Sequence, residues 1–207
     1  MRVTRFIPSG GEDGSMMRTD DSGPPRFGLV LVGCTAADMA SWEARFAGRR
    51  FVISRVDVDA ATGVDAGLAQ MRSAMDAIRA DALSGARVGV AGYRDGGRFA
   101  YLAATRLGAD AAVAFLGAGI AAHLDEAHRA RVPMSLHFSD DDPRVPIADI
   151  RAIKGALEGI GCIDIYRYQR FDAAARELAE LRAMEVLAGV LARDEKSDVP
   201  LERTQDA

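Results

Sequence analysis

Short apolar runs alternate along the chain with segments in which apolar residues recur every three or four positions. A short apolar run bounded by turn-forming residues is typical of a buried strand and is too short to span a membrane. The first run, FGLVLVG at 27–33, is almost continuously apolar, which indicates a strand buried on both faces. Strands are predicted at 27–33, 51–58, 86–93, 111–117, 133–139 and 163–169.

The segments between these strands predict helices. After the second strand, apolar residues step by four, three, four and three positions, which places them on one face of an amphipathic helix. These residues are Val64, Leu68, Met71, Met75 and Ile78. Further helices are predicted over 38–47, directly after residue 97, over 147–159 and in a closing segment that carries Leu178 to Leu191. The alternation predicts an α/β fold, a three-layer sandwich with a mainly parallel central sheet and helices on both faces.

The two ends of the chain lack this periodic pattern. Residues 1–25 are rich in Gly, Ser, Asp and Pro and predict a flexible or loosely docked N-terminal segment. Residues 26–193 are the predicted domain, and the polar residues 194–207 predict a disordered C-terminal tail. The first residues lack the apolar stretch of a signal peptide, so we expect a cytoplasmic protein.

Composition and charge narrow the function classes. A chain of 207 residues corresponds to about one domain at roughly 150 residues each. With 26 basic and 30 acidic residues the net charge is −4, which argues against nucleic acid as the main partner. Two cysteines without metal-ligand spacing predict neither a disulfide framework nor a zinc site. We therefore expect no cofactor, no metal and no membrane partner.

The segment Gly92–Gly97, with the sequence GYRDGG, carries the most specific chemical signal. It lies between a predicted strand and a predicted helix, and this context is typical of a nucleophile elbow. In such a turn the flanking glycines prevent collisions, and the central side chain, here Arg94, is presented in a strained conformation above the helix N-terminus.

In this context the chain resembles the dienelactone hydrolase family of α/β-hydrolases. Three features carry the resemblance in order: GYRDGG, the strand AVAFLGAGI that ends in glycines, and SLHFSDDDPRVP. The resemblance covers about residues 26 to 192 and implies an α/β-hydrolase-type fold. It also implies that Asp142 holds the place of the catalytic acid, Arg94 that of the nucleophile and Ala173 that of the histidine.

Two of these three places hold residues that cannot perform the family's chemistry. Arg94 is a protonated guanidinium at neutral pH and is no nucleophile, and Ala173 is no base. The three histidines of the chain, His123, His128 and His137, all precede the loop in which the family has its own. Acyl transfer needs an activated nucleophile beside a base, so the resemblance implies a pseudoenzyme in which only the acid remains.

Two functions follow as hypotheses. In the first, the protein is catalytically inactive and keeps a cleft that binds a small anionic, carboxylate-type ligand or a partner, with Cys34, Tyr93, Arg94 and Asp95 lining it. In the second, it is an active ester, lactone or thioester hydrolase with a non-standard site such as Cys34. Under either hypothesis, a homodimer is a possible assembly of this chain.

Each candidate residue also has a purely structural interpretation. Arg94 can pair with Asp142 or Asp141 instead of a ligand, and the aspartates at 140–142 are more often solvated than metal-binding. Cys34 is more often a small buried residue than a nucleophile. Tyr93 either packs beneath the elbow or lines the cleft, and His137 is expected in the core.

Overall fold

The computed structural model describes residues 6–8, 15–18, 27–33, 35, 37, 41, 51–58, 61–80 and 87–195. These residues form one sheet of eight strands in the order β1-β2-β4-β3-β5-β6-β7-β8. The strands are β1 (Phe6–Pro8), β2 (Ser15–Arg18), β3 (Phe27–Val32), β4 (Phe51–Val56), β5 (Val88–Tyr93), β6 (Ala111–Phe115), β7 (Met134–Ser139) and β8 (Ile163–Tyr168). From β4 to β8 in this order all neighbours are parallel, which confirms the predicted mainly parallel sheet.

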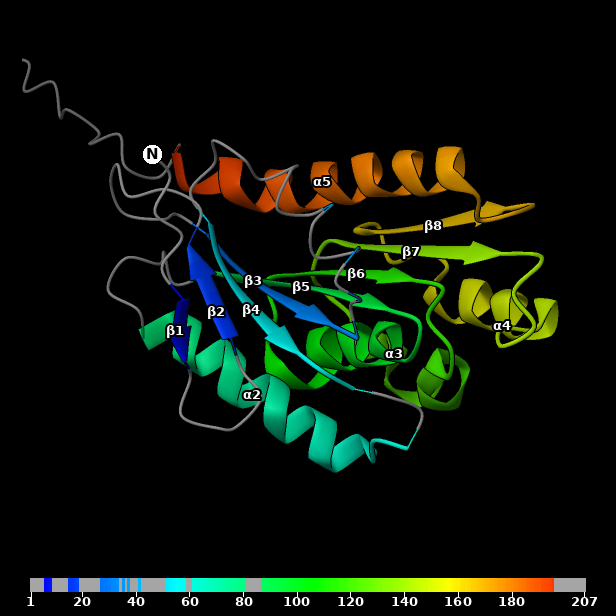
Figure 1. Ribbon diagram of the computed structural model, residues 1–207. Helices are drawn as coiled ribbons and strands as arrows, with labels where there is room; N and C mark the ends of the chain where they lie inside the picture. Colours follow the sequence, from blue (N-terminus) through cyan, green and yellow to red (C-terminus); the bar gives the residue numbers. More distant parts are fainter. Residues whose placement is uncertain are drawn as a thin grey trace, which may run out of the picture.

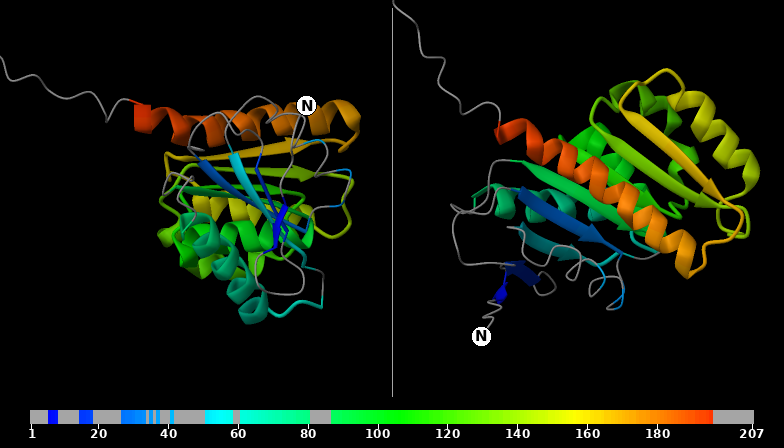
Figure 2. Two further views of the ribbon diagram at one scale, coloured as in Figure 1. Left: turned by 60° about the vertical axis from the view of Figure 1, so that its left-hand side comes forward. Right: turned by 90° about the horizontal axis from the view of Figure 1, so that it is seen from above.

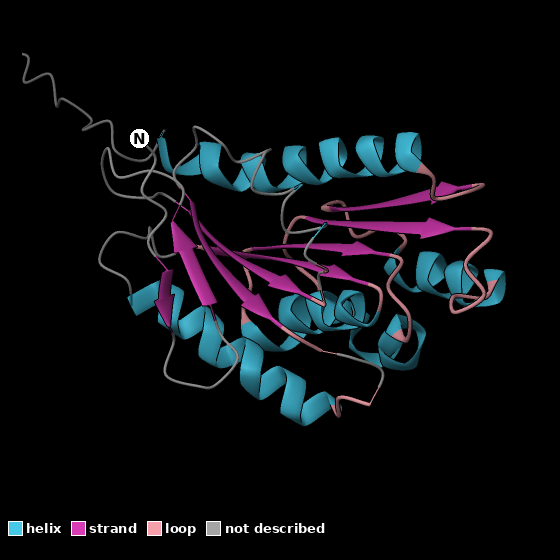
Figure 3. Ribbon diagram, in the orientation of Figure 1, coloured by secondary structure: helices cyan, strands magenta, loops and turns pink. Residues whose placement is uncertain are grey.

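Helices cover both faces of the sheet, as Figure 1 and Figure 3 show. The helical segments are α2 (Val64–Ala80), α3 (Asp95–Leu102), the π-helical η1 (Ala103–Leu107), the 3₁₀-helical η2 (Ile120–Arg129), α4 (Ile147–Leu157) and α5 (Ala173–Glu195). In Figure 1, α5 lies above the sheet, and α2, α3 and α4 lie below it. Viewed from above in Figure 2, α5 crosses the strands obliquely.

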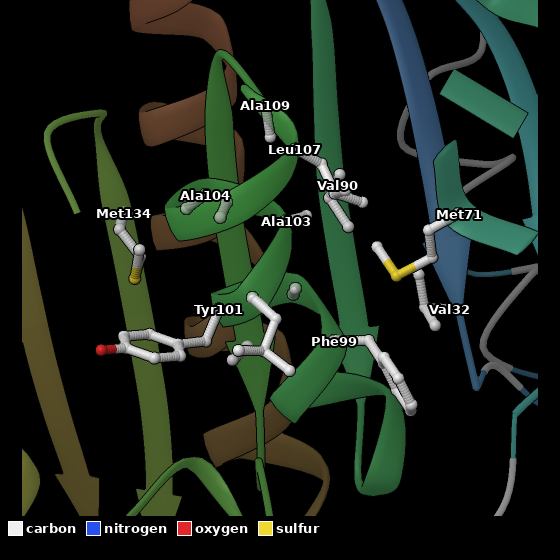
Figure 4. Packing of buried hydrophobic residues seen from close by; sticks show 14 of the residues in the cluster. Val32, Met71, Val90, Phe99, Tyr101, Ala103, Ala104, Leu107, Ala109 and Met134 are labelled. Carbon is white, nitrogen blue, oxygen red and sulfur yellow. The ribbon is translucent and has the colours of Figure 1, made fainter. Parts of the chain in front are cut away.

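The alternation of side chains along each central strand builds a separate core on each face. Val30 and Val32 of β3 pack with the cluster beneath α2 and α3, while Leu29 and Leu31 pack with the cluster beneath α5. All six residues of β3 are buried, as the continuous apolar run predicts. Figure 4 shows the first of these clusters, in which Phe99 lies close to β5 and β3.

Two short strands lie within residues 1–25, the predicted N-terminal segment. β1 and β2 pair with each other and then antiparallel with β4, so they extend the sheet at one edge. Neither strand was predicted, because three or four residues are too few to show an alternating pattern. The predicted helix over 38–47 lies mostly outside the described residues, of which Ser41 is helical and donates a hydrogen bond to Glu180 at 2.8 Å.

The parallel strands end at one common edge of the sheet, the carboxyl edge, and this edge is where α/β sheets bind ligands. In Figure 1 the arrowheads of β5 to β8 point to the side at which α5 begins. β3 has β4 on one side and β5 on the other, so the order of connections reverses there. No helix in the described part of the chain is long and apolar enough to cross a bilayer.

Candidate functional site at the carboxyl edge

A sharp turn joins β5 to α3, and Arg94 is its single connecting residue. The backbone of Arg94 has φ 52° and ψ −115°, a conformation that residues other than glycine rarely adopt. The neighbouring strand fixes this turn, because Arg94 N–H donates a hydrogen bond to the Phe115 carbonyl at 2.8 Å. The strained strand-to-helix turn predicted at Gly92–Gly97 is therefore present, with Arg94 at its apex.

Two glycines make this turn sterically possible. A Cβ atom on Gly92 would lie 2.0 Å from the carbonyl oxygen of Gly96. One on Gly96 would lie 2.2 Å from the carbonyl oxygen of Val32, at the end of β3. The first turn of α3 thus packs directly against the backbones of β5 and β3, and any larger residue would push the helix away.

The loop after β3 lies against the same turn. A Cβ atom on Gly33 would be 3.1 Å from the amide nitrogen of Gly96, and φ is 65° at Gly33. The loop and the elbow therefore meet at the reversal point of the sheet, where an oxyanion hole would need them. Cys34, which the sequence analysis gives both as a residue lining the cleft and as an alternative nucleophile, lies outside the described residues.

Asp142 lies in the loop after β7 and is held by Arg144. The Asp142 carboxylate accepts Arg144 Nε at 2.9 Å, Arg144 Nη2 at 2.6 Å and the Arg144 backbone N–H at 3.0 Å. The Asp142 side chain is only 7% exposed. The hydrogen bond from the Arg144 side chain lowers the pKa of Asp142, with a smaller contribution from the charge of Arg94. The main partner of Asp142 is thus a residue of its own loop.

Arg144 was not among the predicted site residues. Its signal in the sequence is the spacing Asp-x-Arg, which lets an aspartate in a turn bind both the backbone and the side chain two residues later. The predicted pairing of Arg94 with Asp142 is present only as an electrostatic influence on the pKa of Asp142. The hydrogen bond to Asp142 raises the pKa of Arg144, with a smaller contribution from the charge of Asp95, so Arg94, Asp95, Asp142 and Arg144 share one charged neighbourhood.

The other two aspartates of the acidic run also contact arginines. Asp140 forms a bidentate pair with Arg167 of β8, and Asp141 lies 3.8 Å from Arg170. Ser139 at the end of β7 donates a hydrogen bond to Asp141. Across the described residues, no three His, Cys, Asp or Glu side chains gather into a group that could hold a metal ion. Each aspartate of the run 140–142 therefore forms an ion pair with an arginine at the carboxyl edge.

Tyr93 packs beneath the elbow and does not line a cleft. It is 3% exposed, and its ring stacks on Phe115 with 4.5 Å between centroids. The stack continues from Phe115 to His137 at 5.0 Å and from His137 to Tyr166 at 5.1 Å. The row ends with the Arg182 guanidinium 4.1 Å above the Tyr166 ring. His137 is fully buried in this row, which confirms its predicted place in the core.

Ala173, the predicted position of the histidine, is exposed and is the first residue of α5. Asp172 precedes it, and the Asp172 carboxylate accepts the backbone N–H of Ala175 at 3.0 Å. This bond is the usual N-cap arrangement, in which an aspartate satisfies an amide of the first helical turn. The segment that would carry a base is therefore a capped helix start in this chain.

The residue at the apex of the elbow is an arginine at the N-terminus of α3, and a guanidinium and a helix N-terminus both attract negative charge. Of the residues predicted for the site, the structure brings Arg94, Asp95 and Asp142 into one neighbourhood, places Ala173 at the same edge and puts Tyr93 in the core.

The sequence of the chain is similar to that of known proteins. The model of the dienelactone hydrolase family matches residues 52–175. The carboxymethylenebutenolidase of Pseudomonas putida is 26% identical over 129 residues, which cover 62% of this chain and 53% of that protein. The enzyme of the same name from Pseudomonas knackmussii matches equally well. The chain thus spans about half the length of the curated relatives that it matches.

Solved structures show the same fold at low sequence identity. A dienelactone hydrolase-like promiscuous phosphotriesterase from metagenomic libraries superposes with a TM-score of 0.70 at 19% identity, covering 91% of this chain and 98% of that one. An esterase of Pyrococcus furiosus gives a TM-score of 0.71 at 12% identity, covering 91% and 93% of the two chains. These likenesses establish the α/β-hydrolase fold that the sequence predicted.

Proposed function

The chain belongs to the dienelactone hydrolase family, and on that premise we propose that it is a member without hydrolase activity that binds a small carboxylate-type anion at the carboxyl edge. Arg94 at the apex of the elbow is the group that binds the anion. The observation that carries the proposal is the backbone of Arg94, whose strained conformation is the one that an elbow imposes on a nucleophile. A guanidinium stands where the reaction would need a thiolate or an alkoxide.

The electrostatics support an anionic ligand. Both carboxylate oxygens of Asp142 are bonded to Arg144, so Asp142 is largely neutralised by a residue other than Arg94. Arg94 lies at the N-terminus of α3, where the peptide dipoles add positive potential. A planar carboxylate suits the fork of donors on a guanidinium better than a spherical ion does. A small carboxylate is therefore the ligand that this arrangement fits.

We expect no hydrolysis of p-nitrophenyl acetate or of a dienelactone above the rate of the heat-denatured protein. The physical reason is that Arg94 stays protonated and no base occupies position 173. Release of p-nitrophenolate, followed with and without a thiol alkylator, measures this directly. Turnover that the alkylator blocks and that Cys34→Ala abolishes would instead establish the second hypothesis, a hydrolase that uses Cys34.

Binding gives the positive test. We expect Arg94→Gln to weaken the binding of sodium acetate and sodium butyrate by about tenfold or more, because it removes a charge-assisted hydrogen bond. Arg131→Gln is the matched control, since Arg131 is exposed and precedes β7 at the opposite edge of the sheet. Isothermal titration calorimetry on the three proteins measures the effect. Equal affinities for the wild type and Arg94→Gln would refute the role of Arg94.

A further inference from the structure

Leu116 shares with Arg94 an unusual backbone conformation. Its φ is 53°. Among the described residues other than glycine, Leu116 and Arg94 are the two with a positive φ. A branched side chain rarely adopts this conformation, because Cβ then crowds the backbone carbonyl. Such residues persist only where the surroundings impose them, and they cluster at functional sites.

Hydrogen bonds to both neighbouring strands impose the conformation of Leu116. Leu116 N–H donates to the His137 carbonyl of β7 at 2.7 Å, while Arg94 N–H donates to the Phe115 carbonyl of β6. Two residues further on, Ala118 N–H donates to the carbonyl of Arg94 at 3.3 Å. The turn that begins at Leu116 therefore wraps around the elbow residue itself.

The sheet places Leu116 between the charged groups of the site. Tyr93 pairs with Phe115, so Arg94 and Leu116 follow paired residues on strands about 4.8 Å apart. The strand on the other side of β6 is β7, whose following loop carries Asp142. The backbone of Leu116 thus lies between the elbow and the end of β7, at the carboxyl edge.

The side chain of Leu116 is not part of the packed interior. It is partly exposed, and it belongs to neither of the two hydrophobic clusters that the described residues form, nor to the partly buried residues packed against them. Its neighbours along the chain, Phe115 and Ala118, do pack with those clusters. Within the described part of the chain, the Leu116 side chain is therefore an apolar group that neither hydrophobic cluster covers.

We propose that Leu116 is a specificity-determining residue of the Arg94 site and makes it select a carboxylate that carries a short aliphatic chain. This inference rests on the proposed function, since it presupposes that Arg94 binds the carboxylate. With the head group on Arg94, a chain of a few carbons extends over the neighbouring strand end and covers Leu116. Phosphate and other compact anions gain nothing from this contact, because they have no apolar surface to bury.

The test is a series of affinities for acetate, butyrate and hexanoate, with inorganic phosphate as the compact anion. In the wild type we expect the affinity to rise about tenfold for each two methylene groups added, as burial of apolar surface predicts. Leu116→Asn should flatten this series and leave the acetate affinity within about threefold, since asparagine tolerates a positive φ but offers little apolar surface. Leu181→Asn is the matched control, because Leu181 is 49% exposed on α5.

Leu116→Gly is a second variant, which relieves the backbone strain and removes the side chain. If both variants flatten the series, the effect comes from loss of the leucine side chain and not from the asparagine that replaces it. Wild-type affinities that do not depend on chain length, or a dependence that survives in both Leu116 variants, would overturn the assignment of Leu116 while the role of Arg94 stands. Absence of binding by every carboxylate would overturn the proposed function and the role of Leu116 together.

Discussion

Gly92→Ala should destabilise the protein by about 4 kcal/mol or more, or prevent folding altogether. The added Cβ would lie 2.0 Å from the carbonyl oxygen and 2.4 Å from the carbonyl carbon of Gly96, and backbone atoms cannot swing aside as a flexible side chain can. A shift of α3 toward β3 would not relieve this clash, because Gly96 itself packs against the carbonyl oxygen of Val32. Urea denaturation followed by circular dichroism measures the loss.

Gly155→Ala is the control for this prediction. Gly155 lies in the last turn of α4 and is exposed, and a Cβ atom added there would meet nothing within 4 Å. Alanine there should stabilise the protein by about 0.5–1 kcal/mol through helix propensity. If Gly92→Ala instead unfolds within about 1 kcal/mol of the wild type, the close approach of α3 to β5 is not a constraint on the fold.

The second large effect concerns pH. Burial, with a smaller contribution from the charge of Arg182, lowers the pKa of His137 to about 3. The unfolded chain binds this proton at a pKa near 6.5, so between about pH 6.5 and 3 the unfolded state is more protonated than the folded state. The free energy of unfolding therefore falls with decreasing pH over this range, by up to about 1.4 kcal/mol per pH unit from this one residue.

His137→Gln removes the titrating group and should flatten the pH dependence relative to the wild type. Glutamine also loses the hydrogen bonds of the ring to Tyr168 at 3.0 Å and Ser135 at 3.2 Å, so the variant is less stable at pH 7. Urea denaturation at pH 7, 6, 5 and 4 separates the two effects, because the carboxylates contribute equally in both proteins. Parallel curves for the two proteins would contradict the lowered pKa, because they would show that His137 binds its proton equally well in the folded and the unfolded state.

The sequence predicted the parallel part of the fold well, because that part depends on local patterns. The runs at 27–33 and 163–169 differ from β3 and β8 by one residue at the C-terminal end. A continuous apolar run indicates a strand that is buried on both faces, and the layers of helices in the folded protein provide that burial. β1 and β2 escaped prediction because such short edge strands take their structure from pairing with β4 rather than from their own sequence.

The candidate site was predictable where backbone geometry determines it. The glycines of Gly92–Gly97 define the elbow, and with it the place of Arg94. The partners of charged side chains were not predictable, since several arginines compete for each carboxylate and small differences in geometry decide between them. Arg144 binds Asp142 because it is two residues away in the same turn, which costs less entropy than ordering a distant side chain.

The close approach of the elbow to β3 has a consequence for the kinetics of folding. Gly96 lies against the end of β3, which is 64 residues earlier in the chain, and β3 pairs with β5 in a register that joins Gly28 to Val88. Contacts this distant in sequence form late, because a long loop must close before they contribute. The elbow thus assembles only as the central strands come together, so the proposed anion site cannot form in a nascent chain until β5 has been synthesised and docked beside β3.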